Sequence, residues 1–290
     1  MKTGFSRIKK KILILIFVLF LPIPAAMGLP PSRIVSLAPN VTEVLYDLGL
    51  GDRIVAVSTY CNYPPDTEGK PKIGGMSNPS LEAIVALKPD MVVLTDDGNP
   101  QMIQQRLTKL NIRTYVFRAR RLNELPGAIR KLGRVLDVGE QGDRSARRIE
   151  KALKKYEARE RNTSPTARRR ALFVIQTAPL MVAGRDTAID DIMNVLGLRN
   201  IAADAPNKYP HFSLEEVLRR MPDIIFIVKT HDNENRQTAQ FLKRIRQTEA
   251  VRHGRVIFVG DPLLRVGPRL ADGMDEMAGS LETQKNRSVE

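Results

Sequence analysis

Residues 80–90, with the sequence SLEAIVALKPD, are matched later in the chain by residues 213–223, with the sequence SLEEVLRRMPD. Five of the eleven positions are identical, including the closing Pro-Asp pair. Each copy runs directly into an apolar stretch, residues 91–94 in the first case and residues 224–228 in the second. Both copies therefore predict the same three elements in series: a short helix, a Pro-Asp turn and a buried strand.

The surroundings of the two copies also correspond. A Leu-Gly-Leu sequence ends a predicted helix before each copy, and a further strand is predicted after each, at residues 113–117 and 255–259. Strands that alternate with helices favour mainly parallel sheets. The chain is therefore predicted to be an α/β protein with two Rossmann-like lobes, an N-terminal lobe at residues 32–137 and a C-terminal lobe at residues 168–282.

A single long, rigid helix is predicted to join the lobes, at residues 138–162. This region has no proline, has no glycine after Gly142, and places apolar residues three and four positions apart from residue 146 to residue 156. A stiff helical connection should limit how far the two lobes open and close. After the second lobe, residues 283–290 are predicted to form a polar, disordered tail.

The first 28 residues have the three parts of a secretory signal peptide: a basic stretch, an apolar run at residues 12–21 and a small-residue exit. The apolar run is shorter than the roughly 20 residues of a membrane span. We therefore expect cleavage near Gly28 and a free monomer in the periplasm, with an uncleaved membrane anchor as the alternative. Cys61 is the only cysteine, so no internal disulfide is expected.

The formal net charge of +14 falls by five when the leader is removed. Many basic residues lie in residues 144–170, interleaved with acidic ones as on a solvated helix face; attraction to an anionic ligand or membrane is the alternative. Nucleic acid is not expected as a partner, because aromatic residues are not interleaved with the basic ones. The common catalytic motifs are missing, which argues against an enzyme, and the three widely spaced histidines argue against a metal site.

Loops that follow parallel strands are where such sheets bind ligands. Their aromatic, thioether and charged side chains suit a large, partly apolar ligand with amide, carboxylate or phosphate edges. The predicted ligand-binding residues are Tyr60, Met76, Arg185, Tyr209, Asp261 and Arg265. Two alternatives remain at this stage: the two tyrosines as core residues, and Asp261 with Arg265 as an ion pair within one loop.

Two glutamates occupy the same position of the repeat. Glu82 and Glu215 each lie early in a predicted short helix, where the helix dipole favours a carboxylate. A duplicated exposed acid, one on each lobe, is also suited to docking on two copies of a basic partner, and we favour docking. Asn40 and Glu43, three residues apart, fit a helix capping box.

Four segments in this order carry a family resemblance: RIVSLAPNVTE at residues 33–43, YCNYP at residues 60–64, LEAIVALKPD at residues 81–90, and the Pro-Arg pair at residues 268–269. Together they resemble the helical-backbone class of periplasmic binding proteins, and within it most closely the cobalamin-binding members. The resemblance covers nearly the whole chain after the leader. It implies two lobes, bridged by a rigid helix, that bind corrinoids, ferric siderophores or haem for an ABC importer.

The resemblance also implies roles for individual residues. Glu82 and Glu215 match the acids that dock on arginines of a dimeric permease, Tyr60 matches a ligand-contacting tyrosine, and Asp261 with Arg265 matches a polar pocket loop. The family's cobalamin binder has tryptophans in its pocket, whereas this chain has none. Here Tyr209 replaces one tryptophan, and the neighbourhood of Met76 replaces another.

The expected function is the periplasmic substrate-binding component of an ABC importer, which captures a corrinoid such as cobalamin and delivers it to the permease. No cofactor and no chemical step are expected. A ferric siderophore or haem is the alternative ligand. The basic residues Arg185, Lys208 and Arg265 suit an anionic chelate, and Tyr60, Tyr209 or His211 suits haem iron. Further alternatives are an exported ligand sensor and a chelatase-like enzyme.

Overall fold

The structure is a computed structural model that describes residues 30–161, 168–229 and 234–287. The predicted signal peptide lies outside the described residues. Both sheets belong to one compact unit, Pro31–Glu290.

The N-terminal sheet has four parallel strands in the order β2-β1-β3-β4. Its strands are β1 (Ile34–Ser36), β2 (Ile54–Val57), β3 (Met91–Thr95) and β4 (Arg113–Phe117), and its helices are α2 (Pro39–Asp47), α3 (Leu81–Ala86), α4 (Gln101–Lys109) and α5 (Leu125–Val135). All five residues of β3 are buried, as its continuous apolar sequence predicts for a central parallel strand.

The C-terminal sheet has the order β6-β5-β8-β9, with β7 also paired to β5. Its strands are β5 (Arg169–Thr177), β6 (Leu180–Val182), β7 (Leu198–Asn200), β8 (Ile224–Val228) and β9 (Val256–Val259), and its helices are α7 (Ala188–Val195), α8 (Leu214–Arg220), α9 (Glu234–Arg244), α10 (Glu249–Arg252) and α11 (Leu270–Arg287). Only β6 pairs antiparallel, so the prediction of two α/β lobes with mainly parallel sheets is confirmed.

The duplicated segment makes the same contacts in both lobes. Ser80 caps α3 by accepting from Ala83 N, and Ser213 caps α8 by accepting from Glu216 N, both at 3.1 Å. The aspartate that closes each copy then turns back to the first strand of its sheet. Asp90 accepts from the backbone N–H of Arg33 at 3.1 Å, and Asp223 accepts from that of Arg170 at 2.7 Å. The aspartate of each Pro-Asp turn therefore also links the strand that follows it to the neighbouring strand of the sheet.

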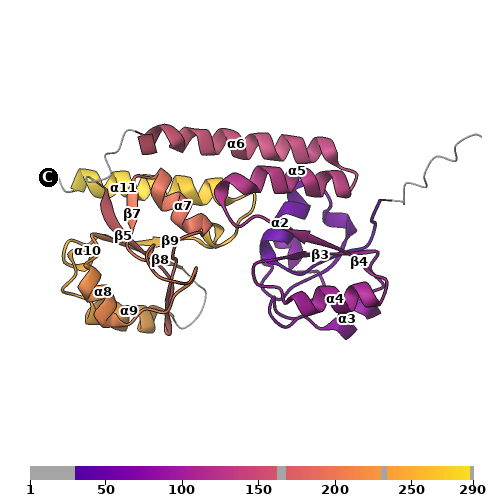
Figure 1. Cartoon of the computed structure of the whole chain (residues 1–290), viewed down its shortest axis with the longest axis horizontal. Helices are drawn as coiled ribbons and strands as arrows, with labels where there is room; N and C mark the ends of the chain where they lie inside the picture. Colours follow the sequence, from indigo (N-terminus) through magenta and orange to yellow (C-terminus); the bar gives the residue numbers. More distant parts are fainter. Residues whose placement is uncertain (1–29, 162–167, 230–233, 288–290) are drawn as a thin grey trace, which may run out of the picture. The chain divides into compact units, whose positions relative to one another are not determined.

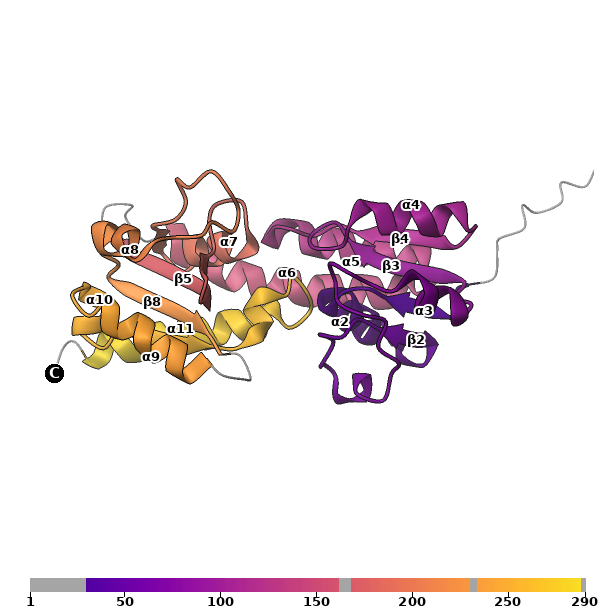
Figure 2. The same ribbon diagram turned by 90° about the horizontal axis from the view of Figure 1, so that it is seen from below.

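Successive residues of each strand point to opposite faces of the sheet and pack in different apolar clusters. Val35 and Val92 pack with Ile84 of α3 on one face of the N-terminal sheet, and Ile225 packs with Val217 of α8 on the corresponding face of the C-terminal sheet. Figure 2 shows α3 and α4 beside the first sheet and α8, α9 and α10 beside the second.

The opposite faces of the two sheets share one apolar core. Ile34 and Val93 of the first sheet belong to the same cluster as Phe173 and Phe226 of the second, whose rings stack at 6.2 Å. Tyr156 of α6 (Gly139–Arg161) joins this cluster. Figure 1 shows α6 alongside α5 and α11, so the single long helix predicted between the lobes is present and packs on both.

Helices α5 and α6 approach closely at a pair of glycines. A Cβ built at Gly133 would lie 3.1 Å from Gly142 Cα and 3.1 Å from the carbonyl oxygen of Val138. Because these are backbone atoms, they have little freedom to move aside. The missing side chains at this crossing therefore set the distance between the two helices.

The prediction of a disordered tail from residue 283 is wrong as far as Arg287, because α11 continues to that residue. The segment has no glycine or proline after Gly279, and Thr283 Oγ1 donates to the Gly279 carbonyl at 3.0 Å. Polar residues of moderate helix propensity extend a helix that is already nucleated.

We predict that Gly133→Val lowers the free energy of unfolding by about 2 kcal/mol, because the new side chain forces α5 and α6 apart. Gly127→Val on the same helix is the control: a Cβ there meets nothing within 4 Å, so its effect should stay within about 0.5 kcal/mol. Urea denaturation followed by circular dichroism measures both. Equal losses in the two variants would contradict close packing at the glycine pair.

A second prediction concerns acid stability. Burial alone would raise the pKa of Asp223, but hydrogen bonds from the Arg170 side chain and backbone N–H outweigh it and hold the pKa below its usual range. The stabilisation is therefore present above about pH 4 and lost as the pH falls further. Asp223→Asn should cost about 1–3 kcal/mol at pH 7 and flatten the loss of stability at acid pH. Asp52→Asn, at an exposed residue, should change neither the stability at pH 7 nor its loss at acid pH. If Asp223→Asn loses stability at acid pH as wild type does, Asp223 is not the group responsible.

Candidate ligand-binding site

The N-terminal half of the candidate site is built around Tyr60, whose side chain is 66% exposed. A Cβ at Gly75 would lie 3.6 Å from Tyr60 Cε2, so the ring lies against the glycine loop. The next residue, Met76, places its Cε 2.7 Å from where a Cβ at Gly98 would be. Asn99 fixes this arrangement by donating to the Met76 carbonyl at 2.8 Å. Loops that follow β2 and β3 therefore form one continuous surface.

The C-terminal half brings Arg185 beside the loop that carries Tyr209. Gly184 N donates to the Lys208 carbonyl at 2.8 Å, and a Cβ at Gly184 would lie 2.7 Å from the carbonyl oxygen of Asn207. Only glycine allows this close approach of two backbones. The Arg185 side chain remains largely exposed, with its Nε 3.9 Å from Asp186 Oδ2.

Tyr209 connects the two halves. Its hydroxyl donates a long hydrogen bond, 3.5 Å, to Asp97 Oδ2 in the loop after β3. Burial of the phenol and the nearby Asp97 carboxylate raise the pKa of Tyr209 to about 12. The phenol is therefore a neutral donor at physiological pH, and 38% of the residue stays exposed. That Tyr209 faces a ligand rather than the core stays a prediction, which a binding experiment tests.

Arg265 is placed by three acceptors. Its guanidinium donates to Glu43 Oε1 at 2.7 Å and to the Tyr60 carbonyl at 3.4 Å, and it pairs with Asp261 at 2.8 Å. The loop pairing of Asp261 with Arg265 is thus present, and Arg265 also reaches the N-terminal lobe. Both residues lie beside Tyr60, so the structure brings them to the candidate site.

Glu43 does not form the predicted capping box. Helix α2 begins at Pro39 with Ala38 as its N-cap, and no side chain caps it. The Glu43 carboxylate instead accepts from Arg265 and from Arg269, the latter at 2.6 and 3.1 Å. Two guanidinium groups satisfy a buried carboxylate better than one backbone N–H does.

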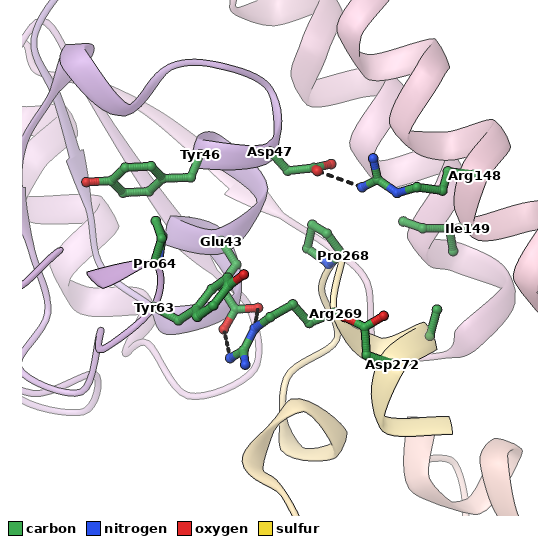
Figure 3. Close-up of a pocket in the computed structure, with 11 residues that line it drawn as sticks. Glu43, Tyr46, Asp47, Tyr63, Pro64, Arg148, Ile149, Pro268, Arg269 and Asp272 are labelled. Carbon is green, nitrogen blue, oxygen red and sulfur yellow. Dashed lines mark hydrogen bonds and ion pairs between the residues drawn. The ribbon is translucent and has the colours of Figure 1, made fainter. Parts of the chain in front are cut away.

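Figure 3 shows Arg269 beside Glu43 and Tyr63, and its guanidinium carbon lies 3.9 Å from the centre of the Tyr63 ring. A hollow of about 460 Å³ lies beside these residues. None of the six predicted ligand-binding residues lines this hollow; Asp47, Arg148 and Asp272 do. It is therefore separate from the surface that carries Tyr60 and Tyr209.

The two predicted docking acids are exposed, on α3 and α8. Glu82 accepts from the Ser80 hydroxyl at 3.2 Å. The backbone N–H of Glu215 and the Ser213 hydroxyl hold the pKa of the Glu215 carboxyl below its usual range. Within the described ranges neither glutamate has a basic side chain within ion-pair distance. Figure 1 shows both helices on the sides of their sheets away from α6.

The histidines show different surroundings. His211 is exposed and pairs through its backbone with Met181, whereas His253 lies 2.9 Å from Glu249. His231 lies outside the described residues. In the part of the chain that is described, no three His, Cys, Asp or Glu side chains are grouped so as to hold a metal ion. Across that same part, no helix has both the length and the apolar character needed to cross a bilayer.

Three residues of the assembled region were not among the predicted site residues: Glu43, Asp97 and Arg269. Asp97 follows a buried strand, which is a usable signal for a ligand loop. Glu43 and Arg269 lie in segments that carry the family resemblance, but no local pattern pairs them, because they are 226 residues apart in the sequence.

Comparison with known proteins identifies relatives that match most of the chain. The family described as periplasmic binding protein matches residues 34–263. The vitamin B12-binding protein of Pectobacterium carotovorum is 32% identical over 200 residues, which are 68% of this chain and 71% of that protein. The corresponding protein of Vibrio parahaemolyticus is 26% identical over 259 residues, or 89% of this chain and 92% of that one.

Solved structures agree with these relatives. The periplasmic vitamin B12 binding protein of Vibrio cholerae superposes with a TM-score of 0.78 at 27% identity, over 88% of this chain and 98% of that chain. A periplasmic heme-binding protein from Roseiflexus sp. RS-1 gives a TM-score of 0.77 at 26% identity, over 87% and 98%. Similarity therefore extends to binding proteins for two different tetrapyrrole-type ligands.

Proposed function

We propose, because the chain belongs to the periplasmic binding protein family, that it is the substrate-binding component of an ABC importer and captures a corrinoid such as cobalamin. The ligand occupies the surface formed by Tyr60, Met76 and Tyr209, with Arg185, Asp261 and Arg265 at its polar edge. The bound protein delivers the ligand to a dimeric permease, and no chemical step is involved. The observation that carries the proposal is the contact of Tyr209 with Asp97, because it brings ligand loops of both sheets together.

The composition of this surface supports a large planar ligand. Exposed aromatic residues are costly to leave in water and are typical of sites that cover an apolar ring system. Tyr60 and Tyr209 are exposed, and Met76 contacts Gly98, which follows the Asp97 that Tyr209 reaches. Amide and phosphate groups at the edge of a corrinoid match the hydrogen-bonding capacity of Arg265 and Asp261.

The relatives named for vitamin B12 binding support a corrinoid over other chelates. Haem or a ferric siderophore is the second candidate, because a heme-binding protein matches the fold at nearly the same identity and Tyr60 offers an exposed phenol. A tyrosine phenolate is an established haem ligand in proteins.

The proposed location is the periplasm, with the first 28 residues acting as a cleaved leader and the mature protein working as a monomer. Glu82 and Glu215 are proposed to contact the two permease subunits. Their support is geometric: each lobe presents one exposed carboxylate at the same position of the repeat.

We predict that the mature protein binds cyanocobalamin with a dissociation constant of about 1 μM or lower by calorimetry. Tyr60→Ala should weaken binding about tenfold, because it removes a large aromatic contact. Met102→Ala, at an exposed residue of α4 outside the site, should leave the affinity unchanged. Haemin and a ferric siderophore are titrated in parallel. Binding of one of these without cyanocobalamin binding would replace the corrinoid with the second candidate, and binding of none would refute the proposed function.

Docking is tested separately by charge reversal. Glu82→Lys with Glu215→Lys should reduce ligand uptake at least tenfold in cells that express the permease, while the affinity for ligand stays the same. Glu68→Lys with Glu140→Lys, at two exposed residues, is the control for the same change in net charge. Normal uptake by the double variant would exclude these glutamates from docking.

A further inference from the structure

A nearly solvent-free group of charges lies beside the candidate site. The Glu43 side chain is 2% exposed, and those of Arg265 and Arg269 are 12% and 18% exposed. Glu43 accepts from both arginines, and Asp261 pairs with Arg265 at 2.8 Å. The two positive charges of Arg265 and Arg269 are therefore matched by the two negative charges of Glu43 and Asp261, in a region where water screens charge only weakly.

The same group is coupled to the surface on which the ligand is proposed to lie. Arg265 Nη2 is 3.4 Å from the carbonyl oxygen of Tyr60, whose ring is exposed. Arg269 lies over the ring of Tyr63. A ligand on Tyr60 is thus close to the guanidinium of Arg265, although Glu43 itself is covered.

Acids are interspersed with the basic residues in the rest of the candidate site. Arg185 Nε lies 3.9 Å from Asp186, which also pairs with Arg121 at 2.7 Å, and the Tyr209 hydroxyl donates to Asp97. A surface built for polyanions has clusters of arginines and lysines without such acids.

We propose that Glu43 is a specificity-determining residue, which neutralises Arg265 and Arg269 and thereby makes the site prefer ligands with uncharged peripheral amides to ligands with peripheral carboxylates. The proposal rests on the corrinoid function above. Unpaired arginines would hold a ligand carboxylate through two parallel hydrogen bonds. Because Glu43 already accepts hydrogen bonds from both arginines, its negative charge repels a ligand carboxylate. A ligand amide is uncharged, and its oxygen can still accept from a free guanidinium N–H.

Glu43 acts through the arginines and makes no contact with the ligand, so it is a positioning residue. A purely structural role would lower the affinity for every ligand alike. A role in selectivity changes the ratio between two ligands that differ in one charge. That ratio is therefore the quantity to measure.

The test uses cyanocobalamin and its monocarboxylates, in each of which one peripheral amide has been hydrolysed. Their affinities are measured by calorimetry with the mature wild-type protein, Glu43→Gln, Arg269→Gln and the double variant. One unit charge about 8 Å away changes affinity by roughly twofold at the dielectric constant of water and roughly thirtyfold at the effective value near a protein surface. We expect wild type to favour the amide, Glu43→Gln to shift the ratio towards the carboxylate by a factor within this range, and Arg269→Gln to shift it the other way.

The double variant restores the charge balance and should return the ratio to the wild-type value. Thermal denaturation establishes that each variant is folded. If Glu43→Gln does not fold, the change in the affinity ratio of Arg269→Gln alone tests the proposal. A ratio that is the same in wild type and every folded variant, for every monocarboxylate isomer, overturns the inference. Failure of wild type to bind cyanocobalamin overturns the proposed function instead, so the two failures are distinct.

Discussion

The ion pairs of Glu43 with Arg265 and Arg269 join helix α2 of the first lobe to the segment before α11 of the second. Removing one member of such a buried group leaves a charge without water or partner, which typically costs about 3–5 kcal/mol. The candidate site depends on these pairs, because Arg265 also holds the Tyr60 carbonyl and Asp261. The same ion pairs therefore hold the two lobes together and set the charge of the candidate site.

The second constraint is the core that both lobes share. Ile34 of the first sheet and Phe226 of the second lie in one apolar cluster that includes Tyr156 of α6. A second set of ion pairs, from Arg121 to Asp186 and Asp191, also connects the lobes. Large opening would break both the apolar and the ionic contacts, so ligand entry is expected to involve the loops and a small movement of the lobes.

The fold was predictable because its signals are local. Apolar runs after each repeat specify strands, and the spacing from Ala146 to Tyr156 specifies α6. The two errors have different causes. Glu43 has the spacing of a capping box, but Pro39 starts the helix earlier and two arginines take the carboxylate. The polar residues after 282 resemble a tail, but no helix-breaking residue ends α11 before Arg287.

The candidate site was only partly predictable. The sequence by itself determined the class of fold, the duplication, the loops that carry Tyr60 and Tyr209, and the two equivalent glutamates, because periodicity, turn residues and repeats are properties of neighbouring positions. Only the tertiary structure decided that Glu43 meets Arg265, 222 residues away, and that Tyr209 meets Asp97. Such pairs join residues that are far apart in the sequence and meet only in the folded protein, so no local pattern in the chain encodes which buried charges will pair.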